Sequence, residues 1–69
     1  AFSLNDRFRF RRELFGNSDI EMSDTLNLVE AMSSYSEAVD YFMTDLQWDA
    51  DNQEVKDFME IIEKHFATR

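Results

Sequence analysis

The sequence predicts an all-α protein, a compact bundle of four short helices. The 69 residues include no proline and one glycine, so the chain has few of the residues that form hairpin turns. Apolar side chains recur every three to four positions, which is the spacing of one face of a helix. Short segments rich in Ser, Asp and Asn separate these stretches and supply helix caps.

The first helix is expected over residues 5–15. Ser3 or Asn5 caps its beginning, and Gly16 suits the left-handed position that follows a helix. One half of the helical wheel collects its apolar side chains, which are Leu4, Phe8, Phe10, Leu14 and Phe15.

Two arginines, Arg7 and Arg11, fall within this apolar half. A buried charge without a partner is costly, so their position needs an explanation. In one interpretation, their stems lie along the edge of the core while their charged ends reach water and pair with carboxylates of another helix. In the other, they contact a binding partner.

The second helix is expected over residues 19–32 and begins with a capping box from Ser18 to Glu21. The third is expected over 35–47 and begins after Ser34, which has the same spacing to a glutamate.

The fourth helix is expected over residues 53–66 and is capped by Asp51. Helices of this length pack in up-down order or cross near ~50°. The predicted core consists of Phe8, Leu14, Phe15, Leu26, Val29, Met32, Val39, Phe42, Leu46, Val55, Phe58, Ile62 and Phe66.

Tyr41 and Trp48 lie away from the apolar stripe of the third helix. Trp48 stands before a turn, which allows it to fold back and close one end of the bundle. The alternative is an exposed Tyr/Trp pair, which would be a hot spot for binding.

The charge of the chain argues against several classes of partner. The net charge is −8, with +2 on residues 1–15 and −10 on the remainder. An acidic chain repels nucleic acid and anionic membranes, and no apolar run approaches the ~20 residues of a membrane span. The absence of Cys fits the reducing cytoplasm.

Residues 1–69 are expected to form a single helical domain, since 43% of them are hydrophobic. Because the chain opens with Ala1 instead of Met, we expect it to be cut from a longer protein or to be processed.

The sequence lacks the residue patterns of metal sites and of catalytic sites, so no cofactor and no enzymatic activity are expected. There is no Cys, and His65 is alone, which leaves no zinc set and no nucleophile with a paired base. A bundle of this size is also expected to enclose no pocket. A calcium loop would place Glu54 where the motif needs glycine, although five of its ligand positions carry Asp49, Asp51, Gln53, Asp57 and Glu60.

Several groups of residues form a recognisable set. They are Asn5, Asp6, Arg7, Phe8, Phe10, Glu13, Leu14 and Phe15, then Glu37, Ala38 and Tyr41, then Trp48 and Asp49, Val55 and Phe58, and His65 and Phe66. In this set the chain resembles a small uncharacterised helical domain at the C-terminal ends of hypothetical proteins of Bacteroidetes-type bacteria. The resemblance covers nearly the whole chain and implies a bacterial C-terminal module without an assigned activity.

The sequence therefore predicts a non-catalytic module for protein–protein interaction or dimerisation. Arginine and aromatic residues on one face are typical of protein interfaces. The expected contact residues are Arg7, Phe10, Arg11 and Tyr41. The alternatives are a purely structural terminal cap with every aromatic buried and an ion-binding protein.

Overall fold

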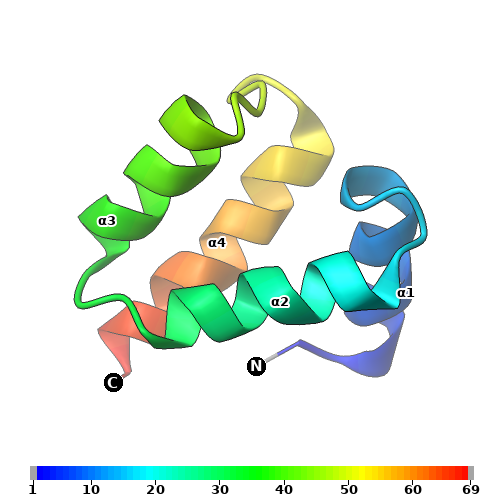
Figure 1. The fold of residues 1–69 in the computed structure, drawn as a ribbon, viewed down its shortest axis with the longest axis horizontal. Helices are drawn as coiled ribbons and strands as arrows, with labels where there is room; N and C mark the ends of the chain where they lie inside the picture. Colours follow the sequence, from blue (N-terminus) through cyan, green and yellow to red (C-terminus); the bar gives the residue numbers. More distant parts are fainter. Residues whose placement is uncertain (1, 69) are drawn as a thin grey trace. The chain divides into compact units, whose positions relative to one another are not determined.

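The all-α prediction is confirmed. A computed structural model describes residues 2–68, and these residues contain four α-helices, one short π-helix and no strand. The chain divides into two units at the junction of Ala31 and Met32. Figure 1 shows the helices in chain order.

The first unit contains α1 (Leu4–Leu14) and α2 (Asp19–Glu30). The hydroxyl of Ser3 accepts a hydrogen bond from the Asp6 amide, so Ser3 is the cap of α1. The second predicted cap is also confirmed, because the Ser18 hydroxyl accepts from the Glu21 amide at 3.1 Å.

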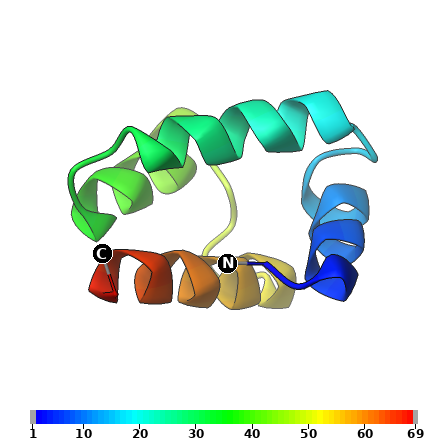
Figure 2. The same ribbon diagram turned by 90° about the horizontal axis from the view of Figure 1, so that it is seen from below.

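A tight turn joins the two helices of this unit and lets them run crosswise (Figure 2). Gly16 has a φ of 57°, the left-handed conformation expected of it, and Asn17 follows with a φ of 65°. The Asn17 amide donates to the carbonyl of Arg11, which satisfies one of the last carbonyls of α1.

The second unit contains α3 (Tyr35–Asp40), the π-helix η1 (Tyr41–Asp45) and α4 (Gln53–Ala67). The helices α3 and α4 lie side by side, and η1 continues α3 without a break (Figure 1). The helix predicted over 35–47 is present, but its second half is a π-helix and it ends at Asp45, two residues earlier than predicted.

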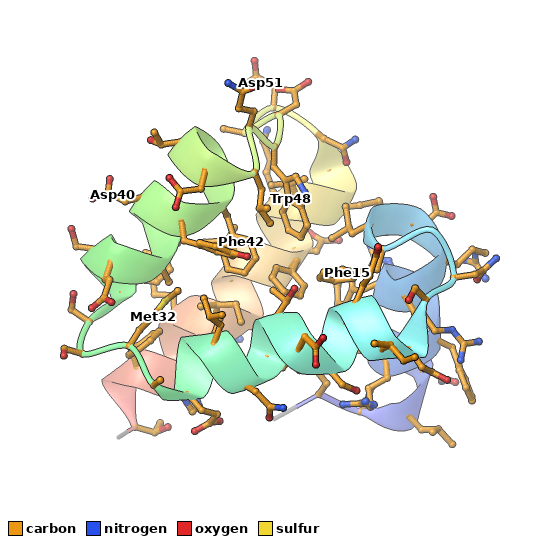
Figure 3. The ribbon with its side chains drawn as sticks, in the orientation of Figure 1. Phe15, Met32, Asp40, Phe42, Trp48 and Asp51 are labelled. Carbon is orange, nitrogen blue, oxygen red and sulfur yellow. The ribbon has the colours of Figure 1, made fainter. Side chains whose placement is uncertain are left out.

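The π-helix widens the last turns of that helix and redirects the chain. The Leu46 amide donates to the Tyr41 carbonyl five residues earlier, and Gln47 then takes a φ of 56°. This reversal carries Trp48 back over Phe42, where the two rings stack with centroids 4.8 Å apart (Figure 3). The Trp48 ring also meets Phe58 edge-on at 5.4 Å. The prediction that Trp48 folds back onto the core is therefore confirmed.

The fourth helix is capped by Asn52, not by Asp51 as predicted. The Asn52 side chain accepts hydrogen bonds from the amides of Glu54 and Val55 at 2.8 and 3.4 Å. Asp51 instead belongs to the preceding turn, in which its amide donates to the Asp49 carboxylate at 2.9 Å.

The buried apolar side chains come from every α-helix and from η1. Most lie on the stripes that the helical spacing predicts. They are Phe10, Phe15, Met22, Val29, Met32, Ala38, Phe42, Val55, Phe58, Met59 and Ile62.

Two predicted core residues, Phe8 and Leu46, are exposed, while Phe10 is fully buried. Phe8 and Phe10 are two residues apart on α1, so they point to nearly opposite sides and cannot share one buried face. The structure buries the Phe10 side, where the Phe2 ring meets Phe10 edge-on at 5.9 Å. Leu46 is exposed because η1 ends before it and the chain turns away.

Candidate protein-binding surface

The first unit carries exposed apolar side chains on one face of α1. Leu4 is 68% exposed and Phe8 is 48% exposed, and the two are neighbours because they are four residues apart on the helix. Arg7 and Arg11 lie on the same side, at spacings of three residues from Leu4 and Phe8. We call Leu4, Arg7, Phe8 and Arg11 the α1 patch.

Arg11 is held in place by two contacts. Its guanidinium lies 5.2 Å from the centre of the Phe8 ring, and its Nη1 lies 3.1 Å from Oδ1 of Asp19. A cation–π contact at an exposed site stabilises by about 0.5–1 kcal/mol, and an exposed ion pair by about 0–1 kcal/mol. Neither contact is large, but together they orient the Phe8 ring and the arginine relative to each other.

The ion pair also joins the last turn of α1 to the first turn of α2. Asp19 is favoured at this position because the amino end of a helix attracts negative charge. This arrangement confirms the prediction that an arginine of the apolar half pairs with a carboxylate of another helix. Ile20, the next residue, is largely exposed and adds apolar surface at the start of α2.

Of the three predicted contact residues on α1, two reach the surface and one does not. Arg7 is exposed and Arg11 is partly exposed, so both reach the surface of α1. Phe10 is 0% exposed and does not reach that surface; Phe8 occupies the exposed position instead. The spacing of Leu4, Phe8 and Arg11 was the signal in the sequence, because it places these three residues on one stripe.

Tyr41, the fourth predicted contact residue, belongs to the second unit. Its side chain is half-buried, and its ring meets Phe42 edge-on at 5.3 Å. The structure therefore ties Tyr41 to the aromatic cluster of this unit, and its role as a contact residue stays a prediction.

A groove of about 670 Å³ runs along the second unit between α3 with η1 and α4. A bundle of this size was expected to enclose no pocket. The presence of this groove corrects that expectation. Val39 and Met43 line one side, and Val55 and Met59, both buried, line the other. The lining also includes Tyr35 and four charged residues, Lys56, Glu60, Glu63 and Lys64. We call this feature the α3–α4 groove.

Tyr35 lines the groove, and the pKa of its phenol is raised above the ordinary value of 10.0. The larger cause is burial, and the smaller is the negative charge of Glu63. Each cause disfavours the phenolate, so the folded protein retains the phenol proton to a higher pH than the unfolded chain does.

This difference predicts a loss of stability at alkaline pH. Below pH 10 the phenol is protonated in both states, and the stabilising effect is fully present; it is lost as the pH rises through the pKa of the folded state. Replacing Tyr35 by phenylalanine removes this contribution. In urea titrations from pH 9 to pH 11, about one unit to either side of the tyrosine reference value, the free energy of unfolding should fall more steeply for the wild type than for Tyr35→Phe. Equal slopes would contradict the assignment.

The residues of the possible calcium register do not converge. Asp49 and Asp51 lie in the turn, while Gln53, Asp57 and Glu60 lie on α4, where the Gln53 amide donates to the Asp57 carboxylate at 2.8 Å. Within residues 2–68 no group of three or more His, Cys, Asp or Glu side chains is placed to hold a metal ion.

A protein-family model matches nearly the whole chain. The model of the family described as Domain of unknown function (DUF8457) matches residues 1–67. The chain belongs to this family. The match confirms the coarser part of the resemblance, which is an uncharacterised domain that spans nearly the whole chain. No match to this DUF8457 chain was found among curated proteins or solved structures.

In the part of the DUF8457 chain that the structure describes, no helix is both long and apolar enough to cross a bilayer.

Proposed function

We propose that this DUF8457 chain is a non-catalytic protein-interaction module that binds its partner through the α1 patch. The partner side of the interface buries Leu4 and Phe8, and Arg7 and Arg11 meet polar or acidic groups around them. The observation that carries the proposal is the exposure of Phe8 beside an arginine that is already oriented by Asp19.

The energetics favour binding at this face. Burial of an exposed Leu or Phe side chain stabilises by about 1.5–3 kcal/mol when the whole side chain leaves water. The Arg11 side chain is restrained by its contacts with Phe8 and Asp19, so less conformational entropy is lost when a partner orders it. Aromatic and arginine side chains are enriched at protein interfaces, and contiguous exposed apolar surface marks them.

The proposed setting is a bacterial cytoplasmic protein in which residues 1–69 form one domain at the C-terminal end of a longer chain. The composition without Cys and the resemblance to terminal domains of bacterial proteins support this setting.

Site-specific photo-crosslinking tests the proposal. A photoreactive phenylalanine analogue replaces Phe8 in the full-length protein that carries this chain, expressed in its own cells. The matched control carries the analogue at Leu28 of α2, whose exposure of 47% is close to the 48% of Phe8. Crosslinked products are expected from position 8 and not from position 28.

Two results would contradict the proposal. One is the absence of any crosslinked product from position 8, which would favour the purely structural cap. The other is an equal yield from positions 8 and 28, which would show random collisions in place of a defined interface.

A further inference from the structure

The α3–α4 groove has the lining of a site for apolar side chains. Val39, Met43, Val55 and Met59 contribute aliphatic and thioether groups from both sides. Methionine adapts its shape to the group that it packs against, and methionine-rich surfaces are common where proteins bind other proteins. A volume of about 670 Å³ lies within the ~300–1,000 Å³ of ordinary ligand sites, so the groove has room for a few large side chains.

The charge of the second unit selects the kind of side chain that approaches. Within the lining, Lys64 pairs with Glu60 at 3.4 Å, and Lys56 and Glu63 balance each other in sign. The unit as a whole is acidic, because residues 32–69 contain nine acidic and three basic residues. A group of apolar side chains flanked by positive charge therefore complements both the apolar lining of the groove and the negative charge of the unit around it.

The α1 patch has this chemistry. It presents Leu4 and Phe8 next to Arg7 and Arg11, on a segment of 15 residues with a net charge of +2. We propose that the α3–α4 groove of one copy receives the α1 patch of a second copy. This inference rests on the proposed function of the α1 patch and names its partner, which is another molecule of the same chain.

The patch and the groove are different surfaces, so two geometries satisfy the contact. Two copies can exchange their patches about a twofold axis, which fills both patches and both grooves in a closed dimer. Alternatively, each copy passes its patch to the next, and the contacts close into a larger ring or continue as an open chain. In either case the wild-type chain is expected to form dimers or larger species as its concentration rises.

Two complementary variants of the 69-residue chain test the contact. Phe8→Glu disables the patch and leaves the groove, whereas Met43→Lys disables the groove and leaves the patch. Size-exclusion chromatography with light scattering should give the monomer mass of 8.2 kDa for each variant alone. An equimolar mixture should give a dimer, because one functional patch then meets one functional groove and the two disabled surfaces stop further growth.

Matched controls separate the contact from a general effect of charge. Leu28→Glu changes an exposed residue of the first unit outside the patch, and Leu46→Lys changes an exposed residue of the second unit outside the groove lining. Both controls should associate like the wild type. Circular dichroism verifies that each variant is folded, and Val39→Lys replaces Met43→Lys if the latter unfolds.

Three results would overturn the inference: a wild-type chain that stays monomeric at high micromolar concentration, variants that associate like the wild type, or a mixture that yields no dimer. The proposed function fails separately. If position 8 crosslinks a different protein while the wild-type chain stays monomeric, the interaction module stands and only the identity of its partner is wrong.

Discussion

Replacing Phe42 by alanine is expected to lower the free energy of unfolding by about 3–5 kcal/mol. Phe42 is fully buried, and its ring contacts those of Tyr41, Trp48 and Phe58 at centroid distances of 5.3, 4.8 and 5.3 Å. Alanine leaves a cavity at the centre of this cluster. A core in so small a domain rarely supplies more than about 3–5 kcal/mol in total, so the variant should be largely unfolded at 25 °C.

Urea denaturation measures this effect, with the fluorescence of Trp48, the only tryptophan, as a probe of the cluster. Leu46→Ala is the matched control in the same segment, because Leu46 is 38% exposed and its truncation should cost less than about 1 kcal/mol. A loss of less than about 1 kcal/mol for Phe42→Ala would show that the cluster is not the core of the second unit.

The second large effect is a contrast between two phenylalanines of α1. Phe10→Ala should cost about 3–5 kcal/mol, whereas Phe8→Ala should cost less than about 1 kcal/mol. Phe10 is fully buried and meets the Phe2 ring, while Phe8 is exposed and lies beside the guanidinium of Arg11.

Thermal and urea unfolding of the two variants, monitored by circular dichroism, measure this contrast. The pair is its own control, because the same substitution is made two residues apart on one helix. If Phe8→Ala were the more damaging change, α1 would be rotated relative to the orientation described here, and the α1 patch would not exist.

The helices were predictable because local signals define them. Ser18 and Ser34 each cap a helix three residues before a glutamate, as the sequence indicated. The turn at Gly16 followed from the conformational freedom of the only glycine. Helix caps and turns are determined by residues close together in the chain, so they can be predicted from one sequence.

The errors arose where packing chooses between local alternatives. Phe8 and Phe10 carry the same side chain on opposite sides of α1, so only the tertiary structure decides which one is buried. Asn52 competes with Asp51 as a helix cap, and both are good capping residues. The π-helix at Tyr41–Asp45 has no strong sequence signal, since its residues also fit an ordinary helix.

The candidate site was predictable only in part, for the same reason. Arg7 and Arg11 were identified because two charges within an apolar stripe are unusual. Phe10 was predicted as their aromatic neighbour at the surface, but Phe10 is buried and Phe8 is exposed, a choice that the sequence left undecided. The α3–α4 groove depends on how two helices lie side by side, and periodicity along each helix carries no information about the space left between them.

The most direct test of the α1 patch as a contact surface is cysteine labelling, because the chain contains no cysteine of its own. Phe8→Cys and Leu28→Cys are prepared separately in the 69-residue chain and treated with a maleimide, first as dilute purified protein and then in intact cells. Both cysteines are expected to react readily in dilute solution, and position 8, but not position 28, is expected to be protected in cells. Equal labelling of the two positions in cells would contradict this expectation.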